Sequence, residues 1–288
     1  MTPMVNPGRP TFGQRLRTQI TQRGPLCVGI DPHPGLLAKW GLTDDVAGLE
    51  RFAFTVVEAL ADRVAVLKPQ SAFFERFGSA GVAVLERVIA QSREAGALTI
   101  VDAKRGDIGS TMAAYAQAYV GAGSSLAGDA VTVSPYLGFE SLRPVLTLAA
   151  ETGRGVFVLA LTSNPEGGTV QHARAPDGRT VAQTIIDAAA AENSGAAPLG
   201  SVGVVVGATV RGVGREHDLE QLNGPLLAPG IGAQGATPAD LRAIFGSALA
   251  DVLPSSSREV LSGGPTTSGL RLAASRSLDA VSGALTPS

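Results

Sequence analysis

The chain has 288 residues, of which 44% are hydrophobic and 17% are charged, so it can bury the core of one α/β barrel or of two small domains. Its formal net charge of −2 gives no reason to expect a nucleic acid or a membrane surface as a partner. Cys27 is the only cysteine, which excludes an intrachain disulfide and a zinc cluster, and neither a membrane-length apolar run nor a signal-peptide core is found. We therefore expect a soluble cytoplasmic protein.

The first predicted elements are a flexible arm and a short helix. Residues 1–10 are rich in Pro and Gly, a composition typical of a loose terminus. Phe12, Leu16 and Ile20 recur at helical spacing. This spacing predicts a helix over 11–22 that lies across one end of the core.

From residue 26 onward, short apolar runs that predict buried strands alternate with amphipathic segments that predict helices. The predicted strands are 26–30, 64–67, 98–102, 130–133, 156–161, 202–206, 226–228 and 252–253. The predicted helices are 47–60, 82–95, 110–120, 142–150, 181–191, 219–222, 238–249 and 270–284. The sequence leaves open whether residues 270–288 belong to the barrel or pack outside it.

Eight strand–helix units predict an α/β fold of the (β/α)8 or TIM-barrel type, as a single domain over residues 1–288. Catalytic groups of such barrels gather at the carboxyl ends of the strands. Several polar residues stand at those predicted ends, namely Asp31, Lys68, Asp102, Lys104, Ser134 and Arg258. The polar connection 162–178 is too long for an ordinary link between strand and helix, so we expect it to be a lid.

The third predicted strand leads into the most informative stretch, residues 102–107, which place two carboxylates around one lysine. In extended backbone, Asp102 and Lys104 project to the same side and can form an ion pair. Asp107 falls in a turn that Gly106 opens. An Asp/Lys pair at a strand end is more often a solvated ion cluster, but its position after a buried strand favours a ligand site.

These residues are part of an ordered set of motifs. Residues 102–109 read Asp-Ala-Lys-Arg-Gly-Asp-Ile-Gly, and the motifs Gly-Ile-Asp-Pro (29–32), Ser-Pro-Tyr (134–136), Thr-Ser-Asn-Pro (162–165), Pro-Gly-Ile-Gly (229–232) and Ser-Arg (257–258) accompany them. In this order they resemble the orotidine 5′-phosphate decarboxylase family, in its longer bacterial type 2 branch. The central string is similar to the family signature of Asp, any residue, Lys, two residues, Asp, and Lys68 is similar to the lysine that completes a Lys-Asp-Lys-Asp array.

The resemblance implies an enzyme that decarboxylates orotidine 5′-phosphate to UMP in de novo pyrimidine biosynthesis, as a cytoplasmic homodimer without a metal or organic cofactor. Lys104 would donate a proton to carbon 6 of the pyrimidine as carbon dioxide leaves. Asp102 would face the departing carboxylate. Lys68 would complete the charged array, and Asp107 would act from the neighbouring subunit.

The resemblance also implies the residues that bind the substrate. Lys68 and Asp31 would hold ribose hydroxyls, and Ser134 would bind the pyrimidine amide. The phosphate would be held by a set that comprises Gln171, Arg258 and the backbone of the glycine loop at Gly230 and Gly232. Such chemistry agrees with the residue types, because a decarboxylation without an electron sink needs a cation where charge develops and a donor to quench it.

Three alternatives are open at this stage. Residues 230–235 match the dinucleotide fingerprint, with Asp251 downstream, which indicates an NAD-dependent oxidoreductase, although no second mononucleotide half follows. A phosphosugar lyase of the same superfamily would share the Asp-Lys-Asp string but would use magnesium, whereas Lys68 and the 134–136 motif favour a pyrimidine nucleotide. A nucleotide-binding protein without catalysis would leave the charged array without a role.

Overall fold

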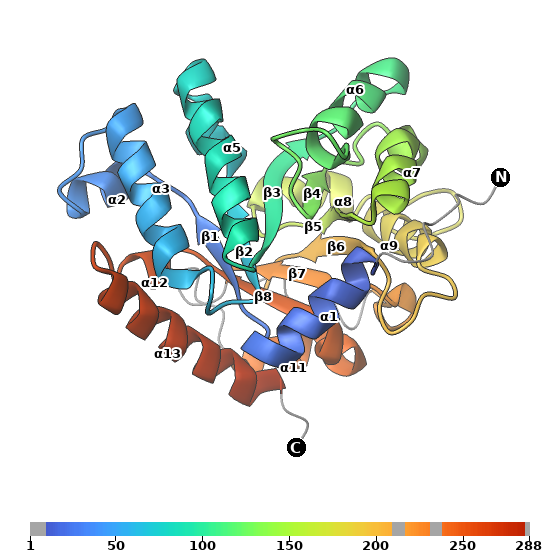
Figure 1. Cartoon of the computed structure of the whole chain (residues 1–288). Helices are drawn as coiled ribbons and strands as arrows, with labels where there is room; N and C mark the ends of the chain where they lie inside the picture. Colours follow the sequence, from blue (N-terminus) through green and yellow to red (C-terminus); the bar gives the residue numbers. More distant parts are fainter. Residues whose placement is uncertain (1–9, 209–216, 231–237, 286–288) are drawn as a thin grey trace.

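Eight parallel strands pair in chain order, and the last pairs with the first, so the sheet closes into a barrel (Figure 1). The structure is a computed structural model that describes residues 10–208, 217–230 and 238–285. The strands are β1 (Cys27–Ile30), β2 (Val66–Pro69), β3 (Leu98–Arg105), β4 (Ala130–Val133), β5 (Gly155–Leu161), β6 (Val202–Val206), β7 (Leu226–Pro229) and β8 (Val252–Ser256). The predicted single-domain (β/α)8 fold is confirmed.

Helices surround this barrel, and each of the longer ones buries an apolar face against it. In α3, for example, Leu49, Phe52, Val56 and Leu60 are buried at helical spacing. The α-helices are α1 (Phe12–Arg23), α2 (Pro34–Lys39), α3 (Val46–Leu60), α4 (Ser71–Glu75), α5 (Gly78–Glu94), α6 (Gly109–Val120), α7 (Arg143–Thr152), α8 (Gly168–Gln171), α9 (Val181–Glu192), α11 (Pro238–Phe245), α12 (Arg258–Leu261) and α13 (Thr267–Leu285). The 3-10 helices are η1 (Phe139–Leu142), η2 (Pro165–Gly167), η3 (Glu220–Leu222) and η4 (Gly246–Asp251).

The strands separate two apolar cores because their side chains alternate between the two faces of the sheet. Along β3, Leu98 and Ile100 belong to the cluster inside the barrel, whereas Val101 belongs to the larger cluster between strands and helices. Asp102 continues the inward-facing series. The alternation therefore carries this carboxylate to the top of the barrel interior.

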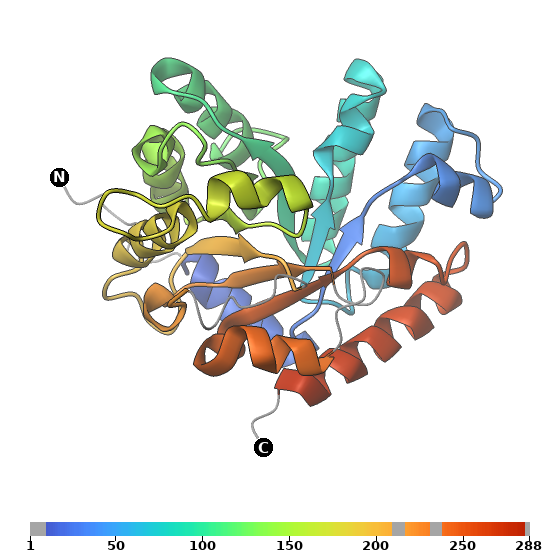
Figure 2. The same ribbon diagram turned by 180° about the vertical axis from the view of Figure 1, so that it is seen from behind.

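Helix α1 closes the amino-terminal end of the barrel, as the helical spacing of residues 11–22 predicts. Phe12 and Leu16 belong to the interior cluster, and the Phe12 ring meets the Phe157 ring edge to face, with centroids 5.9 Å apart. Gly155 permits this approach, because a Cβ atom there would lie 2.2 Å from the Phe12 ring. In Figure 1, α1 crosses the near end of the barrel, and in Figure 2 α8 lies at the opposite end.

Several boundaries differ from the predicted ones. Strands β2 and β3 extend to Pro69 and Arg105, so Lys68 and Lys104 lie within strands and not after them. The sequence analysis did not predict α2, α4 or α12, since helices of four to six residues are too short to show a helical period. Residues 238–249, predicted as one helix, form α11 and most of η4.

The carboxyl-terminal segment packs outside the barrel. Helix α13 runs along α3 and α11, and Leu270 and Val281 are buried in the outer core (Figures 1 and 2). The strand order β1 to β8 in one closed ring also rules out the doubly wound sheet of an NAD-binding domain. Residues 231–235 of the fingerprint, like residues 1–9 of the predicted arm, lie outside the described residues.

None of the helices in the described ranges is both long and apolar enough to cross a membrane.

We predict that Phe12→Ala lowers the free energy of unfolding by about 3 to 5 kcal/mol, because it empties a fully buried position at the base of the barrel. Urea denaturation measures the change. Thr18→Ala, on the exposed side of α1, is the control and should change stability by less than about 0.5 kcal/mol. A Phe12→Ala protein as stable as the wild type would contradict a core role for α1.

Candidate active site

Two adjoining cavities open at the carboxyl ends of the strands, the end of the barrel opposite α1. The first, which we call the lysine cavity, has a volume of about 270 Å³. The second, which we call the arginine cavity, has a volume of about 280 Å³. Lys68 and Pro229 line both cavities, so the two cavities share part of their walls.

The lysine cavity contains a charged array centred on Asp102. Lys68 Nζ donates to Asp102 Oδ2 at 2.7 Å, and Lys104 Nζ donates to Asp102 Oδ1 at 2.6 Å. The side chains of Lys68 and Asp102 are each 8% exposed, whereas that of Lys104 is 43% exposed. The predicted Asp102–Lys104 ion pair is therefore present. Of the two lysines in the array, Lys104 is the one whose side chain reaches solvent.

The charges of this array reinforce one another. Burial by itself raises the pKa of Asp102, but the nearby Lys68 and Lys104 ammonium groups outweigh it and hold that pKa well below its usual range. Burial likewise lowers the pKa of Lys68, but the Asp102 and Asp31 carboxylates outweigh it and hold that pKa above its usual value. Asp102 is consequently an anion, and Lys68 a cation, at neutral pH.

The backbone that brings Lys104 to Asp102 is not the extended one that the sequence analysis assumed. Lys104 has a φ of 48°, a left-handed conformation that residues with a side chain rarely adopt. The pairing of β3 with β4 also shifts register between Val101 and Arg105. The ion pair therefore depends on a bulge and a strained residue, and not on simple alternation.

The arginine cavity contains four of the residues predicted to bind ribose and phosphate, namely Asp31, Lys68, Gly230 and Arg258. Asp31 lies at its wall, and its Oδ1 atom is buried without a hydrogen-bond partner among the described residues. Arg258 is exposed at the first turn of α12, and Gly230 directly follows β7. Gly232 lies outside the described residues. The free carboxylate oxygen and the exposed guanidinium suit a ligand with both hydroxyl and anionic groups.

Ser134 and Gln171 lie near the site but do not line either cavity. The backbone N–H of Ser134 donates to the Arg105 carbonyl at 2.8 Å. The Gln171 amide accepts from the Thr162 N–H at 2.9 Å and donates to the Thr162 hydroxyl at 2.6 Å. The predicted roles of both residues stay predictions.

Among the described residues, Asp107 has no bond to the charged array and is instead bonded within its own loop. Its Oδ1 accepts the backbone N–H of Ile108 at 2.8 Å, and it forms no ion pair with any residue that the structure describes. Asp107 lines neither cavity, and its predicted role stays a prediction.

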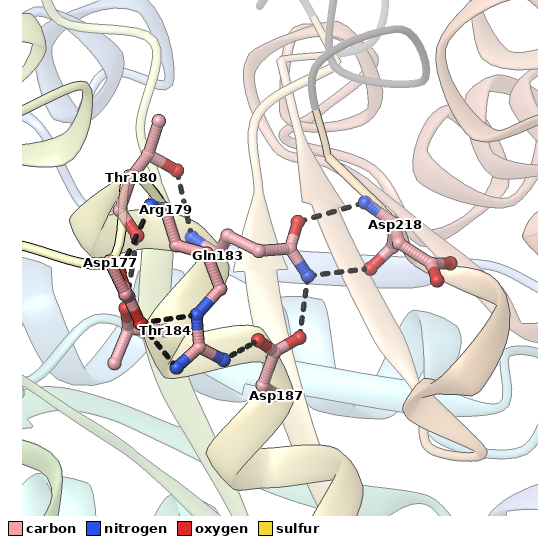
Figure 3. A network of polar contacts seen from close by, with 7 residues as sticks. All are labelled: Asp177, Arg179, Thr180, Gln183, Thr184, Asp187 and Asp218. Carbon is pink, nitrogen blue, oxygen red and sulfur yellow. Dashed lines mark hydrogen bonds and ion pairs between the residues drawn. The ribbon is translucent and has the colours of Figure 1, made fainter. Parts of the chain in front are cut away.

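The predicted lid folds into two short helices, η2 and α8. Its carboxyl-terminal end is fastened by the polar network in Figure 3, in which Arg179 bridges Asp177 at 2.7 Å and Asp187 at 2.6 Å. The Gln183 amide donates to Asp187 at 2.6 Å and accepts from the Asp218 N–H at 2.8 Å. This end of the loop is thus tied to α9 and to the segment after β6.

Comparison with known proteins agrees with the motifs. Residues 24–260 match the family model for the orotidine 5′-phosphate decarboxylase / HUMPS family. An orotidine 5′-phosphate decarboxylase from Salinispora arenicola is 66% identical over 278 residues, which cover 96% of this chain and 99% of that protein. The chain belongs to the orotidine 5′-phosphate decarboxylase family. A further member of this carboxy-lyase family, from Streptomyces coelicolor, is 65% identical over 92% of this chain and 95% of its own length.

Solved structures of the orotidine 5′-phosphate decarboxylase family share the fold. A Streptomyces avermitilis protein provisionally assigned to this activity has a TM-score of 0.94 and 61% identity, with 99% of this chain and 98% of that chain covered. The OMP decarboxylase of Leishmania donovani has a TM-score of 0.77 and 29% identity, with 96% of this chain and all of its own covered. The resemblance inferred from the motifs is confirmed.

Sequence reasoning missed some residues of the site. Thr132 lines the lysine cavity and donates a hydrogen bond to Asp102. The sequence feature that could have indicated it is a polar residue within the apolar strand 130–133. His33 and Phe73, whose rings are 4.2 Å apart, line the arginine cavity. Among residues 10–208, 217–230 and 238–285, no three His, Cys, Asp or Glu side chains gather as metal ligands.

We predict that Asp102→Asn lowers the free energy of unfolding at neutral pH by about 3 to 5 kcal/mol, because it leaves Lys68 buried without its closest anion. Folding lowers the pKa of Asp102, so its stabilisation is present above the unfolded-state pKa of about 3.9 and is lost as the pH falls through the lower folded-state pKa. The difference in the free energy of unfolding between the wild type and Asp102→Asn should therefore become smaller as the pH falls below about 4.

Urea denaturation at several pH values measures this difference. The matched control is Asp62→Asn, since Asp62 is 51% exposed and its loss should cost less than about 1 kcal/mol. A difference that stays constant from neutral to acid pH would contradict an ionised Asp102 in the folded protein.

Proposed function

We propose that the chain decarboxylates orotidine 5′-phosphate to UMP in de novo pyrimidine biosynthesis. The observation that carries the proposal is the Lys68–Asp102–Lys104 array at the junction of two cavities, in a member of the orotidine 5′-phosphate decarboxylase family. We also propose a cytoplasmic location for the chain. The net charge of −2 gives no support to a nucleic acid or a membrane as partner.

The two cavities suit the two halves of a mononucleotide. The lysine cavity has an apolar wall of Leu159, Val205 and Leu227, which suits the faces of a pyrimidine ring. In the arginine cavity, Asp31 and Lys68 would bind ribose hydroxyls, and Arg258 and the Gly230 backbone would bind the phosphate. The family resemblance adds the backbone of Gly232 to the phosphate-binding set. Closure of the lid would bring Gln171 to the phosphate, and Ser134 would bind the pyrimidine amide.

The proposed reaction breaks the bond between carbon 6 and the carboxylate, and its electron pair stays on carbon 6 as carbon dioxide leaves. The Lys104 ammonium, the accessible cation beside Asp102, stabilises that negative charge. It then transfers a proton to carbon 6, which forms the C–H bond of UMP and leaves a neutral amine. Solvent restores the proton to Lys104.

Asp102 would contribute by remaining charged. The two ammonium groups hold its pKa low, so a substrate carboxylate placed next to it meets an anion. This repulsion is relieved when carbon dioxide departs. In this proposal Lys104 supplies the positive charge, and the reaction needs no metal or organic cofactor.

We further propose a homodimer in which Asp107 completes the site of the partner subunit. Among the described residues Asp107 forms no ion pair, and it is half-buried in a loop that packs against the loop after β4. Three apolar side chains on these two loops are exposed, namely Ile108 (62%), Tyr136 (78%) and Leu137 (53%). Burial of such a patch against a second copy would favour association.

The direct test is incubation of the wild-type protein with orotidine 5′-phosphate while its ultraviolet absorbance and the formation of UMP are followed. We expect turnover that survives exhaustive chelation. Absence of turnover would contradict the proposed function. Activity that disappears on chelation and returns with magnesium would favour a phosphosugar lyase.

Lys104→Ala should lower kcat by about 10²- to 10⁴-fold or more, because the variant lacks both the proton donor and the cation. UMP should still bind, with a Kd within about tenfold of the wild type, because Lys104 acts on charge that exists only during the reaction. Steady-state kinetics and calorimetric titration with UMP measure the two effects. Retention of more than a few per cent of turnover would remove Lys104 from this role.

A mixture of inactive Lys104→Ala and Asp107→Ala proteins should recover about a quarter of wild-type activity once subunits exchange. Random pairing makes about half of the dimers mixed, and each mixed dimer has one intact site of two. Mass spectrometry of differently labelled subunits verifies the exchange. Exchange without recovery would contradict the shared site, but not the decarboxylase activity.

A further inference from the structure

Thr132 occupies the position on β4 that faces the bulge of β3. The ladder pairs Val101 with Val131 and then Arg105 with Val133, so three residues of β3 lie opposite Thr132 alone. A bulge of this kind removes backbone groups from the regular ladder of hydrogen bonds. Buried backbone groups that leave the ladder need another partner.

The Thr132 hydroxyl supplies that partner. It is almost fully buried, it accepts the backbone N–H of Lys104 at 3.0 Å, and it donates to Asp102 Oδ1 at 2.8 Å. A hydroxyl has one proton, and because an ionised carboxylate can only accept, that proton is directed to Asp102. One side chain therefore contacts both members of the Asp102–Lys104 ion pair.

The contact to Lys104 falls at the strained point of the chain. With its φ of 48°, Lys104 is in a conformation that costs free energy and persists only where its surroundings hold it. The hydrogen bond from the Lys104 N–H to Thr132 is such a restraint. Without it, the backbone can relax and carry the ammonium away from Asp102 Oδ1, its partner at 2.6 Å.

We propose that Thr132 is a positioning residue for the reaction, which fixes the Lys104 backbone and the Asp102 carboxylate together and so aims the ammonium at the reacting carbon. This inference rests on the proposed decarboxylase activity. Small displacements of a catalytic group reduce rate far more than binding. Loss of the hydroxyl should thus affect kcat more than KM.

The test compares Thr132→Val, which keeps the shape but lacks the hydroxyl, with Thr132→Ser, which keeps the hydroxyl. We expect Thr132→Val to lower kcat by about 10- to 100-fold, the effect of losing one hydrogen bond to a charged group. KM and the Kd for UMP should stay within about threefold of the wild type. Thr132→Ser should recover most of the lost turnover, but not all, because a serine hydroxyl has more rotameric freedom.

Thr99→Val is the matched control. Thr99 lies on β3, is almost fully buried, and its hydroxyl has no hydrogen-bond partner among the described residues. The Thr99→Val substitution should leave kcat unchanged. Urea denaturation and circular dichroism show whether each variant is folded, and if Thr132→Val does not fold, Thr132→Ala and Thr132→Ser form the comparison.

Three outcomes would overturn the proposal while the wild type remains active. They are a kcat of Thr132→Val within about threefold of the wild type, a parallel loss of UMP binding, and a Thr132→Ser protein as impaired as Thr132→Val. An inactive wild type would overturn the proposed function itself, and this inference with it. The two failures are therefore distinguishable in one set of assays.

Discussion

The architecture of the site depends on one buried carboxylate held by two ammonium groups. Asp102 accepts from Lys68 on one oxygen, and from Lys104 and Thr132 on the other. A buried ion is costly unless each of its lone pairs is matched, and here three donors from three neighbouring strands converge on it. The charge state of Asp102, the position of Lys104 and the local shape of β3 are therefore linked, and none can change independently.

Much of the fold and part of the site follow from the sequence by simple physical rules. Short apolar runs mark strands that are buried on both faces, and eight of them leave a closed barrel as the natural arrangement. Since parallel strands end on the same side, Asp31, Lys68 and Asp102 had to meet there, although 71 positions separate the first from the last. Motif order then identified the family.

The details that sequence reasoning missed depend on pairing between segments. A bulge is a property of two strands in register, so neither the residues of β3 nor those of β4 predict that Lys104 is left-handed. Likewise, the bond between Gln171 and Thr162 depends on how a long loop folds back, for which no periodicity exists. Thr132 looked like an ordinary strand residue because its proposed role depends on its contacts with Asp102 and Lys104 on the neighbouring strand.

The closure of the barrel by α1 has a consequence for how the chain folds during synthesis. Arg17 of this helix pairs with Asp251, 234 residues further along the chain, and Gly13 donates to Ser201 at 3.2 Å. Helix α1 therefore leaves the ribosome long before β8, the last strand of the ring it closes, has been made. Until then its apolar face has no complete surface to cover, so the full set of α1 contacts can form only after the whole barrel has been synthesised.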